Sequence, residues 1–221
     1  MIAGIKEKIL DTSMEMFMKK GYEQTSIRAI AEECGVTHAN ILYHFKGKSD
    51  ISKYILKKYL DALEAETSVI ASGNSLRPSV SKATLFWVMH LCYMVEYPSF
   101  AHVYSDMLKD NRGIVADILL SHKDDTAQLT VGNYIDKKNM EDVRLFSWKM
   151  NILSDADFRT IEMLSKGDLN LREAAGYMVD FIYMLFTGRK IPETTLNRDV
   201  SLMLDLISSD SLKRIYNDCV K

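Results

Sequence analysis

The sequence predicts an all-α protein in which a small N-terminal domain is joined by a long helix to a larger helical domain. Apolar residues recur at intervals of three and four along almost the whole chain, which is the period of an amphipathic helix. The 221 residues include only three prolines and ten glycines, and no segment has the pattern of a run of strands. A composition of 47% hydrophobic and 26% charged residues is that of a chain that buries a core.

Four helices are predicted in the first 72 residues, and each has a recognisable start or stop. Gly21 ends the first helix, after lysines in its last turn that suit the negative end of the helix dipole. Gly35 ends the second helix. Thr37 caps the third, while Val36 before it and Ile41 inside it form a hydrophobic staple. The predicted ranges are about 5–20, about 26–34, from 37 onward, and about 48–72.

The segment SGNSLRPS, residues 72–79, is the clearest boundary after the fourth helix. Turn residues such as Pro98, Gly113, Gly167 and Gly188 divide the remainder. The predicted helices there are about 79–95, 99–110, 113–137, 141–164, 171–188 and 195–217.

Composition and local motifs exclude several classes of protein. The three cysteines, Cys34, Cys92 and Cys219, lie far apart without zinc-ligand spacing, so we expect no metal, no disulfide framework and a cytoplasmic location. The apolar stretches are too short to span a bilayer, and the N-terminus does not have the pattern of a signal peptide. No local catalytic or phosphate-loop motif occurs, so we expect neither an enzyme nor a cofactor.

Charge is distributed unevenly along the chain. Residues 1–60 carry 10 Lys/Arg against 7 Asp/Glu, whereas the remainder carries 18 against 23, which together give the net charge of −2. A basic head on an acidic body suits a protein that contacts phosphate at one end only.

The most informative stretch is TSIRAIAEECGVTHANILYHFKGK, residues 25–48. Two short amphipathic helices joined by a three-residue turn with Gly35 fit a DNA-binding helix-turn-helix, although a helical hairpin without that function has the same local pattern. At 100° per residue the third helix should turn Ile41, Leu42 and Phe45 inward. Its outward set, which has no acidic group, is Ala39, Asn40, Tyr43 and His44, with His38 at the rim.

This stretch resembles the N-terminal domain of the tetracycline-repressor (TetR) family. The shared features are FMKKGYEQTS at the end of the first helix, TSIRAIA in the second, the GVT turn, the pair His44–Phe45, and Lys48 at the start of the fourth helix. The resemblance covers about residues 5–60. Leu42 departs from the pattern because tyrosine is most common there, and Tyr43 follows it. Cys34 stands where alanine is usual.

The resemblance implies DNA contacts at specific positions. It assigns Thr25, Ser26 and Arg28 to phosphate and groove contacts, and Lys48 to a phosphate at the positive end of the fourth helix. The recognition surface would comprise Thr37, His38, Ala39, Asn40, Tyr43 and His44. We expect domains at 1–50, with the motif at about 26–45, and at 51–221, the latter for regulation and dimerisation.

The second domain offers candidates for two further sites. Loosely, the resemblance implies that the last two helices pair with a second subunit, through Ala174, Ala175, Met178, Phe181, Ile182, Leu185, Val200, Met203, Leu204 and Ile207; burial within one subunit is the alternative. A pocket for a small apolar or amphipathic effector is expected among Trp87, His90, Met94, Tyr97, His102, Tyr104, Met107 and Trp148, although these residues equally suit a filled core.

We therefore expect a homodimeric transcriptional regulator that binds a double-stranded DNA operator and has no membrane partner. The first hypothesis is a repressor released by a small-molecule effector. The alternative is a DNA-bound adaptor controlled by a protein partner, without a small-molecule ligand. An enzyme with an accessory helix-turn-helix is the least supported reading.

Overall fold

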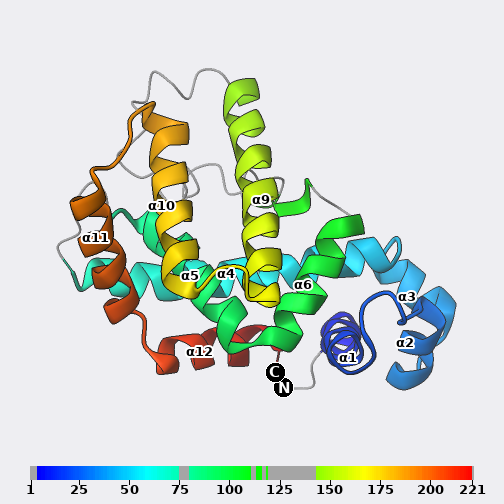
Figure 1. Cartoon of the computed structure of the whole chain (residues 1–221). Coiled ribbons are helices and arrows are strands. Elements are labelled where there is room, and N and C mark those ends of the chain that lie inside the picture. Colours follow the sequence, from blue (N-terminus) through cyan, green and yellow to red (C-terminus); the bar gives the residue numbers. More distant parts are fainter. Residues whose placement is uncertain (1–3, 75–79, 111–112, 116–117, 119–142, 221) are drawn as a thin grey trace.

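The computed structural model describes residues 4–74, 80–110, 113–115, 118 and 143–220, and within these ranges it contains helices and no strand (Figure 1). The all-α prediction is confirmed. The helices are α1 (Ile5–Lys20), α2 (Ile27–Cys34), α3 (His38–His44), α4 (Lys48–Ser72), α5 (Lys82–Glu96), α6 (Pro98–Asp110), α9 (Val143–Lys166), α10 (Leu171–Thr187), α11 (Glu193–Leu206) and α12 (Ser209–Val220).

The predicted boundaries agree closely with the structure through α4 and differ most at the C-terminus. The predicted helix at 113–137 lies almost entirely outside the described residues. The single helix predicted at 195–217 is wrong, because the structure has two helices there, α11 and α12. Ile207 takes an extended conformation (φ −89°, ψ 108°), and the Ser208 hydroxyl then accepts the Ser211 N–H at 3.1 Å. This hydrogen bond satisfies an N-terminal amide of α12, which allows the chain to change direction.

The helices are arranged around two central helices, α4 and α5. The N-terminal helices α1, α2 and α3 lie at one end, and α9 and α10 stand side by side and antiparallel over the other (Figure 1). In sequence α10 follows α9 after a short turn, and in space α10 packs mainly on α5. All residues of α5 from Ala83 to Met94 are buried, as expected for a helix with apolar residues all round.

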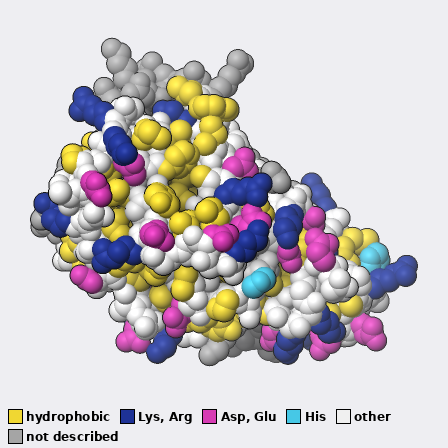
Figure 2. All heavy atoms as spheres, viewed as in Figure 1, with side chains coloured by type: hydrophobic (Ala, Val, Ile, Leu, Met, Phe, Trp, Pro, Cys, Tyr) yellow, Lys and Arg dark blue, Asp and Glu magenta, His cyan; other side chains and the backbone are white. Residues whose placement is uncertain are grey.

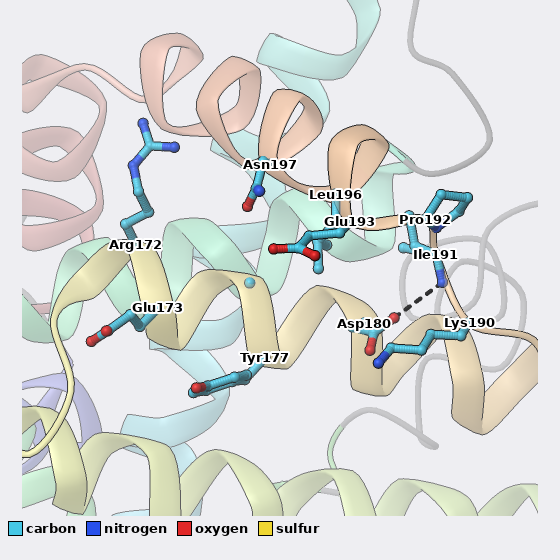
Figure 3. Close-up of a pocket in the computed structure, with 11 residues that line it drawn as sticks. Arg172, Glu173, Tyr177, Asp180, Lys190, Ile191, Pro192, Glu193, Leu196 and Asn197 are labelled. Atoms are coloured by element: carbon cyan, nitrogen blue, oxygen red, sulfur yellow. Dashed lines mark hydrogen bonds between the residues drawn. The ribbon is translucent and has the colours of Figure 1, made fainter.

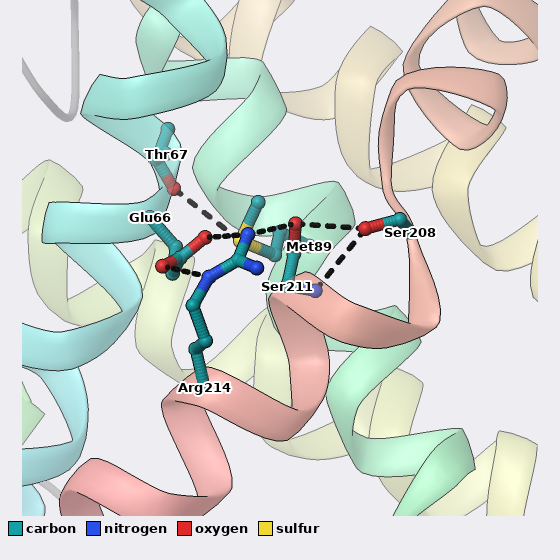
Figure 4. A network of polar contacts seen from close by, with 6 residues as sticks. All are labelled: Glu66, Thr67, Met89, Ser208, Ser211 and Arg214. Carbon is teal, nitrogen blue, oxygen red and sulfur yellow. Dashed lines mark hydrogen bonds and ion pairs between the residues drawn. The ribbon is translucent and has the colours of Figure 1, made fainter.

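The C-terminal helix α12 returns beneath α4, which also leads to the small N-terminal helices. Its Arg214 binds both carboxylate oxygens of Glu66 on α4, at 2.7 and 2.9 Å, and also donates to Ser211 (Figure 4). These hydrogen bonds from Glu66 raise the pKa of Arg214. This ion pair links α12 to α4, the helix that leads to the N-terminal domain.

None of the helices in the described ranges combines the length and apolar character that a membrane crossing requires.

Candidate nucleic-acid interface

The third helix is fixed to the N-terminal domain by a small aromatic and aliphatic core. Ile41 of α3 and Phe45, which directly follows this helix, are at most 1% exposed, and they belong to the same core as Phe17 of α1 and Ile30 of α2. Phe17 also meets the ring of Tyr22 edge to face at 5.0 Å. Because both inward positions of α3 are packed, the opposite face of the helix has a defined orientation.

The turn before α3 is set by local hydrogen bonds that the sequence predicted. Gly35 has φ +67° and donates its N–H to the end of α2, in the left-handed conformation that favours glycine. The Thr37 hydroxyl accepts the Asn40 N–H at 3.2 Å, so the predicted cap is present. These two residues end one helix and begin the next within three positions.

The exposed face of α3 is apolar and aromatic at its centre. Tyr43 is 85% exposed, and Ala39 is exposed beside it one turn earlier. Asn40 and His44 lie at one flank and are partly buried. Leu42 was expected to point inward, but it is 44% exposed on the other flank. It lies 100° from Ile41 around the helix, and on this short helix the core covers only the narrow face of Ile41 and Phe45.

The three residues expected at the start of α2 are placed differently from one another. Thr25 is 1% exposed, and its hydroxyl donates to the Gly21 carbonyl at 2.8 Å, so this side chain faces the protein and not the surface. Ser26 is exposed and caps α2 by accepting the Ala29 N–H. Arg28 is exposed on the first turn of α2.

Lys48 stands at the start of α4, next to the end of α3, and is held by Tyr22. Its ammonium donates to the Tyr22 carbonyl at 3.0 Å and lies 4.1 Å from the centre of the Tyr22 ring. Burial raises the pKa of Tyr22 to about 12, so the ring remains a neutral partner for the cation. Lys46 is exposed between α3 and α4, and the sequence analysis did not assign it although it follows the His44–Phe45 pair.

The residues expected to bind a ligand fall into two groups. Trp87, His90, Met94, Tyr104 and Met107 are buried in the core of the second domain. The others lie elsewhere: Tyr97 stacks on Tyr216 at 4.6 Å, His102 is exposed and contacts the Pro98 carbonyl, and Trp148 is 58% exposed on α9.

A buried polar network joins four helices in that core. Tyr59 of α4 lies 2.7 Å from Nδ1 of His90 on α5, and Nε2 of the same ring lies 3.2 Å from Oδ1 of Asp157 on α9. Tyr104 of α6 donates to the other Asp157 oxygen at 3.0 Å. Burial raises the pKa of both tyrosines, so both hydroxyls remain neutral, and Tyr59 and His90 share a hydrogen bond. Sequence reasoning missed Tyr59 and Asp157, although Asp157 interrupts an apolar face of its helix.

Two clefts in the described part of the second domain bear on ligand binding. The larger, about 710 Å³, lies between α10 and α11; Arg172 and Asp180 of α10, Glu193 of α11 and Lys190 between the two helices are among its charged lining residues (Figure 3). None of the expected ligand residues lines it. The smaller, about 210 Å³, lies between α5, α6 and α9, and Met94 and His102 are among its lining residues.

Most residues expected at the dimer interface are buried within one chain. Those at most 2% exposed are Ala174, Ala175, Met178, Ile182, Val200 and Met203, and those half-buried are Phe181, Leu185, Leu204 and Ile207. α10 packs on α5 and on α11 of the same chain, which accounts for this burial.

A different apolar surface is exposed on α9 and α10. Leu145, Trp148 and Met163 of α9 and Tyr177 and Met184 of α10 are between 40% and 64% exposed. Hydrophobic side chains gather over these two helices in the space-filling view (Figure 2). We call these five residues the α9–α10 face.

Among the described residues, no group of three or more His, Cys, Asp or Glu side chains is arranged to hold a metal ion.

Comparison with known proteins gives a family match over the N-terminal part of the chain. The family model described as "Bacterial regulatory proteins, tetR family" matches residues 9–55, which run from α1 into α4. The probable HTH-type transcriptional regulator YttP of Bacillus subtilis is 31% identical over 75 residues, which are 34% of this chain and 36% of that protein. The HTH-type transcriptional repressor KstR2 of Rhodococcus jostii is 28% identical over 79 residues, 35% of this chain and 39% of that protein.

The chain thus spans well under half the length of these two relatives. Among solved structures, the transcriptional regulator FadR of Bacillus subtilis in complex with stearoyl-CoA is similar over 83% of this chain and 98% of that chain, with 17% identity and a TM-score of 0.44.

Proposed function

The chain belongs to the TetR family of bacterial transcriptional regulators, and we propose that it acts as a homodimeric repressor that a small molecule releases from its DNA operator. The observation that carries the DNA-binding part is the exposed face of α3, which is oriented by a packed core and has no acidic side chain. A helix of this kind fits the major groove of B-DNA.

The DNA contacts divide into two kinds. Asn40 and His44 offer hydrogen-bonding groups toward base edges, and Tyr43 reaches furthest from the helix. Thr37, His38 and Ala39 complete this surface at the N-terminal end of α3. Phosphate contacts come from Ser26, Arg28 and Lys48. An ammonium group has three donors, so Lys48 contacts a phosphate while it still donates to the Tyr22 carbonyl.

For the dimer we propose the α9–α10 face. Its exposed Trp, Leu, Met and Tyr side chains form one surface along two antiparallel helices, and contiguous apolar surface of this kind marks an interaction site. Two copies packed through it would make a four-helix bundle. The predicted residues on α11 fit this interface less well, because Val200 and Met203 are buried in their own chain.

Release of DNA would follow from a change in the distance between the two α3 helices. Two reading heads engage successive major grooves only when they are about 34–36 Å apart. An effector that binds more tightly to a conformation with another spacing shifts the population away from the DNA-bound form. α4 carries the N-terminal domain at one end and Tyr59 of the buried network in its middle, so it is the element through which such a shift would pass.

The alternative is an adaptor controlled by a protein partner. The observation in its favour is that Trp87, Tyr104 and Met107 fill the core of the second domain.

Selection of DNA sequences from a random duplex pool, followed by binding titrations with the selected duplex, tests the proposed function. We expect sites with two half-sites about one helical turn apart, and a variant lacking Tyr43 and Asn40 side chains should lose the preference for the selected sequence. Metabolites that raise the melting temperature are then added to the complex. Recovery of no preferred sequence would refute the DNA-binding proposal, and operator release by a protein alone would favour the adaptor.

A further inference from the structure

Three buried polar atoms of the second domain have no hydrogen-bond partner among the residues that the structure describes. They are Nε1 of Trp87, Nε2 of His90 and Oδ1 of Asp157. The last two approach to 3.2 Å without the alignment of a hydrogen bond, and the Trp87 and His90 rings lie 5.7 Å apart. All three side chains are at most 1% exposed. We call them the polar trio.

Three polar atoms without hydrogen-bond partners in an apolar core lower the stability of the folded chain. Each buried polar atom without a partner loses the hydrogen bond that it makes to water in the unfolded chain, and natural cores satisfy nearly all such groups. The indole N–H of Trp87 can only donate, whereas a carboxylate oxygen of Asp157 can only accept. A group that both accepts and donates therefore supplies what each of these two atoms lacks.

The smaller cleft begins one helical turn from His90 on α5 and one helical turn from Asp157 on α9, and two turns from Trp87. Met94 follows His90 by four residues on α5, and Ile161 follows Asp157 by four residues on α9. Both side chains line the cleft of about 210 Å³, together with Leu164. A shift of Met94, an adaptable side chain, together with Ile161 would connect the cleft to the trio.

We propose that the effector is a small amphipathic molecule whose neutral hydroxyl or amide head binds the polar trio, while its apolar body fills the cleft between α5, α6 and α9. The head accepts from Trp87 and donates to Asp157. A carboxylate head is excluded by repulsion from Asp157, and an ammonium head leaves Trp87 without an acceptor. This inference rests on the proposed function, of which it names the ligand class.

The chain has only two tryptophans, which allows a direct test. In Trp148→Phe the tryptophan fluorescence, excited at a wavelength where tyrosine does not absorb, comes from buried Trp87 alone. This variant is titrated with benzyl alcohol, benzamide, benzoate, benzylamine and toluene, which share one apolar ring and differ in the head. We expect saturable changes in Trp87 emission and a raised melting temperature with the alcohol and the amide, and at least tenfold weaker effects with the other three.

Two further variants test the head contacts. Asp157→Asn keeps the shape of the side chain but changes its acceptor. Trp87→Phe, followed by melting temperature, removes the indole donor together with part of the ring. Both should lose the preference for alcohol and amide over toluene, whereas Val69→Ala, at an exposed position of α4 outside the cleft, should keep it. If a variant does not fold, the ligand series on the parent protein still decides the matter. Equal responses to all five compounds, or none, would overturn the inference.

Titrations with the selected operator distinguish a failure of this inference from a failure of the proposed function. Specific DNA binding that is released by molecules of another class, with no response at Trp87, refutes the polar trio as the effector site and leaves the repressor intact. A head-dependent response at Trp87 without specific DNA binding refutes the repressor and leaves the ligand site.

Discussion

Replacement of Trp148 by glutamate should separate the proposed dimer into monomers. Trp148 is 58% exposed at the α9–α10 face. An aromatic side chain buries about 150–250 Å² in all, so a partner would cover roughly 90–145 Å² more on each copy. At about 25 cal/mol per Å² this contributes about 2–4 kcal/mol per copy, or about 4–7 kcal/mol for the pair. Since 1.4 kcal/mol is tenfold in affinity, dimerisation should weaken by about a thousandfold or more.

Sedimentation velocity across nanomolar to micromolar concentrations measures this change. Val69→Glu is the matched control, because Val69 is 62% exposed on α4, away from the proposed interface, and its substitution should leave the mass unchanged. Circular dichroism should show both variants folded. Ala175→Glu is unsuitable for this purpose, because Ala175 is buried in its own chain and a charge there would unfold it. A Trp148→Glu protein that remains dimeric at nanomolar concentration would show that the interface lies elsewhere.

Three further predictions address other parts of the molecule. Lys48→Ala should weaken binding to operator and random duplex by a similar factor and should make DNA affinity less dependent on salt concentration. Because the donor to the Tyr22 carbonyl is lost, it should also lower the free energy of unfolding in urea titrations by about 1–2 kcal/mol. Asn40→Ala should cost about 1–3 kcal/mol on the operator and far less on random DNA; equal losses on both would refute base contact. Burial raises the thiol pKa of Cys92 to about 12 and of Cys219 to about 11. The free energy of unfolding should therefore hold below pH 9 and fall as the pH rises through 11. In urea titrations, Cys219→Ala should make this free energy depend less steeply on pH.

The sequence alone determined the helices of the N-terminal domain and their order. The stop at Gly35 and the cap at Thr37 depend on hydrogen bonds between residues three or four apart, so local sequence is sufficient to predict them. The same holds for the glycine that ends α1. The family pattern in this stretch also predicted the proposed DNA-binding function, because its residues are close in sequence as well as in space.

The tertiary structure decided which sides of those helices are covered. Leu42 is exposed although it is apolar, because the domain core reaches only the neighbouring face of α3. Thr25 is buried although it is polar, because its hydroxyl donates to the end of α1. Helical periodicity gives an angle around the axis, but the width of the covered face depends on which neighbours pack there.

In the second domain, the buried and exposed faces of the helices depended most on tertiary contacts. The apolar stripes of α10 and α11 were compatible with a partner subunit or with their own core. Packing on α5 covers most of these stripes, whereas the α9–α10 face is exposed. The buried network joins Tyr59 to His90 and His90 to Asp157, across 31 and 67 residues of sequence. Pairings over such distances arise from the way helices pack against one another, and no local hydrogen bond or period in the sequence encodes them.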